Sequence, residues 1–145
     1  MTEQGTTETA TTVEELNAHV GTMGEHMGLE ITEASAERVV ARMPVERNLQ
    51  PYGLLHGGAS VALAETVGSI LSMLVAGPGR AAVGMTITAV HHRPVMTGMV
   101  TGTATVVASG RTTATSQIAV TDEDGNRVCT CTLMCQLRDA PPAKA

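Results

Sequence analysis

Hydrophobic residues follow two different spacings along this chain, and the change of spacing separates a helical part from strand-forming parts. Residues 57–76 are apolar at almost every position, include a single charged residue, and are followed by Gly77-Pro78-Gly79. A long apolar run that is stopped by two glycines and a proline predicts one long helix. Because such a helix is apolar nearly all round, we expect it to be central and buried.

Alternating patterns rich in Val, Thr and Ile predict strands on both sides of this helix. Two short strands precede it, and four longer ones follow it, with turns at 94–98 and 122–125. The expected strands are 29–33, 37–43, 81–92, 99–109, 111–121 and 126–138. One long helix followed by consecutive antiparallel strands is an α+β pattern. We therefore expect an antiparallel sheet wrapped around one long central helix.

The polar ends of the chain bound a single domain. Residues 1–11 are rich in Thr and Glu and too polar to pack, so we expect a disordered tail there. The sequence Thr12-Val13-Glu14-Glu15 has the form of a capping box and predicts a short helix, roughly to Val20. Three glycines break up the segment that follows: Gly21, Gly24 and Gly28. The domain is expected over 12–138, with a loose C-terminal tail over 139–145.

Composition and charge exclude several classes of function. The 145 residues carry a net charge of −5, and the basic residues are scattered, which argues against a nucleic-acid partner or an anionic membrane surface. The start of the chain lacks the basic and apolar regions of a signal peptide, so we expect a cytoplasmic protein. We also expect no membrane-spanning segment.

Three cysteines lie close together near the end of the chain: Cys129, Cys131 and Cys135. Their odd number and crowding favour reduced thiols over a disulfide framework. They alternate with Leu133 on one face of the expected strand, which indicates core packing. The sequence has no matching pair of His or Cys residues that would complete a metal site with them. The sequence contains no Phe or Trp and one Tyr, Tyr52, so we expect a core of aliphatic side chains and methionines.

The candidate chemistry lies at the start and in the middle of the long helix. Gly57 and Gly58 leave room at the helix start, where free backbone N–H groups and the helix dipole favour a developing negative charge. This arrangement is typical of an oxyanion hole. Glu65 is the one carboxylate of the helix, with no basic residue three or four positions away. It is therefore the candidate base or nucleophile, and Ser69, four residues on, is placed to hold it or an attacking water.

The distance along the helix implies that two chains build the site. Eight residues at the usual rise separate Gly57 from Glu65 by about 12 Å, so one acyl carbonyl cannot touch both in a single chain. The two groups meet only if two helices run antiparallel across a twofold axis. We therefore expect at least a homodimer.

Two motifs give the chain a family resemblance. The sequence from Gln50 to Gly58, QPYGLLHGG, leading into AETVGS at 64–69, resembles the hotdog-fold acyl-CoA thioesterases. The segment TAVHHRPV at 88–95 is also similar to that family, in the branch with the 4-hydroxybenzoyl-CoA, phenylacetyl-CoA, 1,4-dihydroxy-2-naphthoyl-CoA and enterobactin proofreading thioesterases. The likeness covers roughly 12–138. It implies a sheet wrapped round the helix, dimers that often pair into tetramers, and a site at the subunit interface.

The resemblance also implies a role for each residue of the motifs. Glu65 would be the nucleophile or general base, the Gly57 N–H would polarise the thioester carbonyl, and Ser69 would place water. His56 and Gln50 would assist at the carbonyl oxygen or the thiolate. The substrate-binding residues implied are Gly58 at the helix start, His91 and His92 near the acyl or pantetheine channel, and Arg93 or Arg111 at the CoA phosphates. The resemblance implies an acyl-CoA substrate of aryl or arylacetyl type, or an acyl-carrier thioester, and it implies no cofactor or metal apart from the coenzyme A of the substrate.

Each assignment has a structural alternative. Glu65 could bind backbone N–H groups of a partner subunit, His56 could serve only to cap the helix, and the two glycines could serve only close packing. His91 is in phase with Val83, Met85 and Ile87, as a core or interface histidine would be. Two other functions also fit the pattern. The first is a hydratase or dehydratase of the same fold, and the second is a non-catalytic acyl-CoA sensor.

Overall fold

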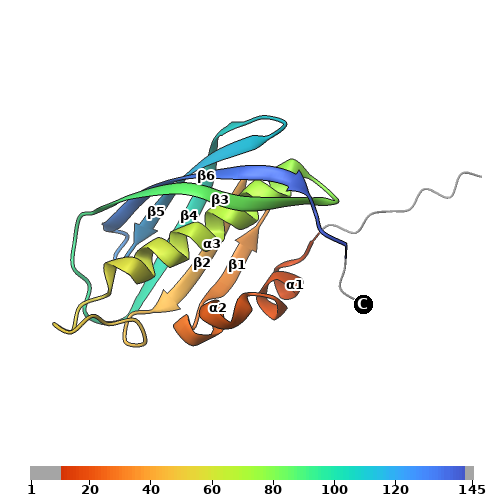
Figure 1. Ribbon diagram of the computed structural model, residues 1–145. Coiled ribbons are helices and arrows are strands. Elements are labelled where there is room, and N and C mark those ends of the chain that lie inside the picture. Colours follow the sequence, from red (N-terminus) through yellow and green to blue (C-terminus); the bar gives the residue numbers. More distant parts are fainter. Residues whose placement is uncertain (1–10, 143–145) are drawn as a thin grey trace, which may run out of the picture.

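The computed structural model describes residues 11–142, and its elements follow the expected order (Figure 1). The predicted N-terminal tail and the last three residues lie outside this range, apart from Thr11. The helices are α1 (Val13–Ala18), α2 (Gly21–Met27) and α3 (Gly57–Ala76). The strands are β1 (Glu30–Ala34), β2 (Arg38–Pro44), β3 (Arg80–His91), β4 (Met99–Ser109), β5 (Thr113–Thr121) and β6 (Arg127–Asp139).

The six strands form one antiparallel sheet in the order β1-β2-β4-β5-β6-β3. The sheet curves around α3, while α1 and α2 lie beside α3 at the β1 end (Figure 1). This confirms the expected α+β architecture. Strands β1 and β3 are the two edges, so β3 has one side hydrogen-bonded to β6 and one side open.

Helix α3 is buried along one stripe only, which corrects the expectation of a helix buried all round. The stripe that packs on the sheet consists of Ser60, Leu63, Ala64, Val67, Gly68, Leu71 and Ser72. Glu65 lies off this stripe and is exposed in the single chain. Helix α3 is also long and apolar enough by composition to cross a membrane, contrary to expectation. Its packing against the sheet identifies it as the core helix of this fold.

The core is aliphatic and sulfur-containing, as the composition predicts. Cys129, Cys131 and Cys135 are free and buried on the helix-facing side of β6, which confirms their role in core packing. Burial, together with the neighbouring Cys129 sulfur, raises the pKa of the Cys131 thiol to about 12. A Cβ at Gly68 would lie 2.7 Å from Leu133 Cδ2, so this glycine lets α3 approach the sheet closely.

The chain before β1 differs from the expected single helix. The capping box is confirmed, because the Glu15 N–H donates to Thr12 Oγ1 and the Thr12 N–H donates to Glu15 Oε2. Gly21 begins a second helix instead of ending helical structure, and Gly28 caps it with φ 70°. At the other end, β6 continues to Asp139, so the C-terminal tail starts later than expected.

Candidate active site

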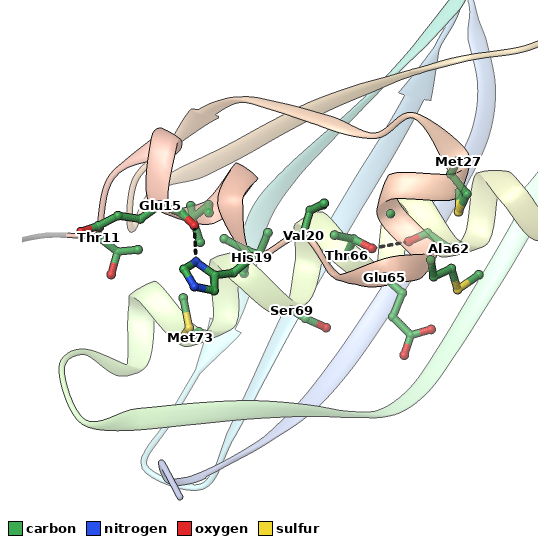
Figure 2. A pocket seen from close by; sticks show the side chains of 14 residues that line it. Thr11, Glu15, His19, Val20, Met27, Ala62, Glu65, Thr66, Ser69 and Met73 are labelled. Atoms are coloured by element: carbon green, nitrogen blue, oxygen red, sulfur yellow. Dashed lines mark hydrogen bonds between the residues drawn. The ribbon is translucent and has the colours of Figure 1, made fainter. Parts of the chain in front are cut away.

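Two cavities contact α3 at different points. A groove of about 650 Å³ runs between α3 and the α1–α2 segment, and its apolar walls include Met27, Ile70 and Met73. Glu65 and Ser69 line the same groove, and Figure 2 shows both side chains on α3 among the other lining residues. A second cavity, of about 340 Å³, lies at the start of α3 and is lined by Gln50, Gly57, Ser60, His91, His92 and Arg93, among others.

Within the described part of its own chain, the Glu65 carboxylate is positioned by van der Waals contact and not by a hydrogen bond. Its Oε1 atom lies against Gly84 of β3, where a Cβ would come within 2.6 Å of it. Ser69 Oγ lies 3.9 Å from Cys135 Sγ, and within residues 11–142 no hydrogen bond joins Ser69 to Glu65. The carboxylate is therefore open to solvent and to whatever enters the groove.

The start of α3 offers two N–H donors with different surroundings. His56 is the N-cap, and its Nδ1 accepts a 2.8 Å hydrogen bond from the Gly58 N–H. The capping alternative for His56 is thus present in the structure, and it leaves Nε2 as the protonated, donating nitrogen of the neutral ring. No acceptor in the described part of the chain takes the Gly57 N–H. Gly57 lines the second cavity, and a free N–H at the helix start fits the predicted oxyanion donor.

Gln50 reaches the same cavity from the loop before α3. Its side-chain Oε1 accepts a 2.6 Å hydrogen bond from the Tyr52 N–H, so the amide NH₂ is the end left to donate to a ligand. Its backbone N–H donates to Leu54 O, which closes the loop on itself. Gln50 and Gly57 are therefore brought together as predicted, with two N–H donors at one cavity.

His91, the last residue of β3, and His92, which follows it, make different contacts. The His91 ring lies against the helix start, since a Cβ at Gly57 would be 3.0 Å from its Nε2. The His92 ring is 2.9 Å from the Thr130 hydroxyl. Thr130 alternates with buried residues of β6, so this bond draws the His92 ring toward the outer face of the sheet. Both histidines line the second cavity, and His91 is the one in close contact with Gly57.

A β-bulge in β3 corrects the expected phase of His91. The pairing with β6 shifts between Gly84 and Thr86, so Met85 is an extra residue in the strand. Beyond the bulge, Ile87 and His91 pair with buried β6 residues and face α3, whereas Val83 before it is exposed. His91 is therefore in phase with Ile87 but not with Val83.

Arg93 and Arg111, both predicted at the CoA phosphates, lie near opposite ends of β3. Arg93 lines the second cavity, just after the end of the strand. Arg111 lies near the start of the strand, where its carbonyl accepts a hydrogen bond from Arg80. One chain therefore does not bring these two residues to a common phosphate.

Asn48 is a positioning residue that the sequence did not single out. Its Nδ2 donates to Met27 O and Pro44 O, both at 2.8 Å, and its own carbonyl accepts from the His56 N–H. The residue thus ties α2, β2 and the start of α3 together. An asparagine inside a loop that contains Pro and Gly could have predicted this role, because asparagine side chains often form hydrogen bonds with nearby backbone groups.

Replacement of Asn48 by alanine leaves two partly buried carbonyls without a donor. We expect the variant to lose about 1–3 kcal/mol of unfolding free energy and to lower kcat, since Gln50 and His56 lie on the loosened loop. Urea unfolding and steady-state kinetics measure both effects. Unchanged stability in Asn48→Ala would show that the loop is held by other contacts.

Comparison with known proteins agrees with the fold. The chain matches the family model of the thioesterase superfamily over residues 52–129. It is 47% identical over 121 residues to the proofreading thioesterase EntH of Cronobacter turicensis, covering 82% of this chain and 88% of that protein. Thioesterase HI1161 of Haemophilus influenzae has a similar structure, with a TM-score of 0.86 and 38% identity over 90% of this chain and 93% of that chain. A variant of thioesterase PA1618 of Pseudomonas aeruginosa gives a TM-score of 0.85 and 34% identity over 92% and 98%.

Fold and sequence together define the class of protein. The chain belongs to the thioesterase superfamily and has its hotdog fold. The protein is a thioesterase, an enzyme that hydrolyses thioesters, as the two motifs predicted.

Proposed function

We propose that this enzyme hydrolyses acyl-CoA or acyl-carrier thioesters with Glu65 as nucleophile or general base and the start of the partner's α3 as oxyanion site. One observation carries the proposal. The only carboxylate of α3 lines one cavity, while Gly57, whose N–H has no acceptor within residues 11–142, lines another on the same chain. Since eight helical residues separate them by about 12 Å, a second chain must complete each site.

The open edge of β3 supports a pairing that brings the two parts together. Glu65 lies against Gly84, and Gly57 lies against His91 of the same strand. If two β3 edges pair antiparallel with the twofold axis at Thr88, Gly84 of one chain comes opposite His91 of the other, because the bulge at Met85 leaves the same number of pairing positions between Thr88 and each of them. The edge carries no Pro or charge between its end residues, which an unpaired edge usually needs. Its exposed side chains include Val83, Met85 and Val90, at 45%, 60% and 58% exposure.

The proposed reaction divides its tasks between the two chains. The acyl group occupies the groove beside Glu65, and its carbonyl oxygen accepts from the partner's Gly57 N–H. The partner's His56 Nε2–H and Gln50 NH₂ are the further donors at that oxygen or at the departing sulfur. Glu65 attacks the carbonyl carbon, or removes a proton from a water held near Ser69. The C–S bond breaks, the thiolate takes up a proton, and water supplies the hydroxyl of the free acid.

The acyl group is the part of the substrate that the groove selects. The apolar part of its lining consists of aliphatic and thioether side chains, with no Phe, Trp or Tyr, and Glu15, His19 and Thr66 are polar residues of the lining besides Glu65 and Ser69. We propose an aryl or arylacetyl thioester, as the family resemblance implies, bound by apolar burial and methionine contacts without aromatic stacking. Medium-chain acyl groups are the competing class for the same walls.

The outer face of the sheet supports the proposed tetramer. A row of cross-strand neighbours on this face runs through Thr88, Thr132, Gln117 and Thr105. The row is uncharged and its side chains are short or flexible, so the surface is flat enough to pack on a second dimer. Sedimentation at several concentrations distinguishes dimer from tetramer.

A thiol-release assay tests the proposed function. The wild-type enzyme is assayed with benzoyl-type, phenylacetyl and medium-chain acyl-CoAs, and products are analysed for free acid. Hydrolysis with a higher kcat/KM for the aryl substrates supports the proposal. A product that keeps its thioester but gains or loses water would indicate a hydratase or dehydratase, and binding without turnover would indicate a sensor.

A further inference from the structure

Gly84 of β3 lies where the Glu65 carboxylate rests. A Cβ built on Gly84 would be 2.6 Å from Glu65 Oε1, while the next nearest atom of another residue, Leu133 Cδ1, is 3.7 Å away. The position is therefore open except for the carboxylate. A methyl group added there would contact the end of the Glu65 side chain, and its three nearest atoms all belong to side chains.

The β-bulge explains why a glycine of this strand faces the helix. Gly84 pairs with Cys135, which is buried and faces α3, and the extra residue Met85 follows directly. Bulges bend a strand locally and change the direction of nearby side chains. Here the bulge lies between the two β3 positions that contact the predicted site residues, Gly84 at Glu65 and His91 at Gly57.

We propose that Gly84 is a positioning residue, whose missing side chain lets the Glu65 carboxylate lie on β3 at the orientation used for hydrolysis. The inference rests on the proposed function, because it assigns Gly84 a role only through Glu65. Glu65 has no hydrogen-bond donor within residues 11–142 that fixes its direction. Close contact with the strand surface is then what limits its position.

The variant Gly84→Ala is expected to move the Glu65 carboxylate without replacing any of the proposed catalytic residues. To reach ordinary contact distance, Oε1 must retreat by about 0.8 Å from the new methyl group. Displacements of that order in a catalytic group cost roughly 10- to 100-fold in rate. We expect kcat to fall by about that factor while KM changes less than about threefold, because the acyl groove is untouched.

A double-mutant cycle with Glu65→Asp tests whether Gly84 acts through Glu65. Aspartate is one methylene shorter, so its carboxylate no longer reaches the methyl group at position 84. Glu65→Asp alone lowers kcat, and adding Gly84→Ala to it should change kcat by less than about twofold. If the two losses multiply instead, Gly84 acts independently of the carboxylate and the proposal is overturned.

Two other glycines are matched controls. A Cβ at Gly102 would lie 3.0 Å from Leu63 Cγ in the core, so Gly102→Ala reports on packing strain away from Glu65. A Cβ at Gly110 would have only Thr113 O within 4 Å, at 3.9 Å, so Gly110→Ala is expected to be neutral. Gly84→Ala should resemble Gly110→Ala in melting temperature and oligomeric state. Its kcat should be lower than that of either control variant. A melting temperature that falls as far as that of Gly102→Ala would make Gly84 a packing residue and overturn the proposal.

The failure of this inference is distinguishable from failure of the proposed function. If Glu65→Ala keeps wild-type turnover, the proposed mechanism is wrong whatever Gly84 does. If Glu65→Ala is inactive and Gly84→Ala keeps wild-type kcat, the mechanism stands and the positioning role of Gly84 is overturned.

Discussion

Replacing Glu65 with glutamine is expected to lower kcat by at least about 10³-fold, the range seen when a nucleophile or essential base is removed. The amide is nearly the same size as the carboxylate, but it neither attacks the carbonyl nor takes a proton. Because Glu65 is exposed in the single chain and makes no ion pair within residues 11–142, folding does not depend on its charge. We expect KM, melting temperature and oligomeric state to stay close to wild type.

The measurement is the thiol-release rate at saturating substrate, with Glu37→Gln as the matched control. Glu37 lies exposed in the turn between β1 and β2, away from both cavities. It should keep full activity. Turnover within tenfold of wild type in Glu65→Gln would remove Glu65 from the chemistry.

Replacing Gly57 with proline is expected to lower kcat by about 10²–10³-fold, the usual loss when one oxyanion donor is removed. Gly57 is the first residue of α3, a position where proline is well tolerated. The preceding residue, His56, already has φ −65° and ψ 128°, which proline favours in its neighbour. The substitution therefore deletes one N–H group and leaves the helix in place.

Gly57→Ala separates the lost N–H from the added bulk. Both variants place a Cβ about 3.0 Å from His91 Nε2, but only the proline lacks the donor. We expect the alanine variant to keep most of the activity that the proline variant loses. Equal losses in the two variants would assign the effect to crowding of His91, and the N–H would have no special role.

The sequence predicted the helix and the sheet because their signals are local. The apolar run ending at Gly77 and the alternating Val and Thr residues each determine one element through its own periodicity. The capping box at Thr12 is equally local. Element ends were less well predicted: β6 continues to Asp139, since backbone pairing with β3 extends it beyond the hydrophobic pattern.

The sequence contains the motif residues of the candidate site, but their arrangement in space depends on tertiary contacts. Gln50 and Gly57 line one cavity, and Glu65 and Ser69 line the other; both placements follow from motifs on one loop and one helix. The exposure of Glu65 could not be predicted, since it depends on the sheet covering only one side of α3. The bulge at Met85 and the contact with Gly84 depend on the register between β3 and β6, for which no local signal exists.

The orientations of His92 and Arg111 show the same limit. His92 follows the last residue of β3, so the strand pattern does not set the direction of its side chain. Its contact with the Thr130 hydroxyl is tertiary and has no local signal. Arg111 precedes β5, and only the sheet order reveals that it lies near the start of β3, far along the strand from Arg93.

The central claim is that each site combines one chain's Glu65 with the other chain's Gly57. Mixing the two inactive variants tests it most directly: Glu65→Gln and Gly57→Pro are unfolded together at equal concentration, refolded, and assayed. Half of the dimers then contain both variants, and each of these has one site with both intact parts. The account predicts recovery of about a quarter of wild-type activity. A mixture no more active than its two components would contradict a site shared between chains.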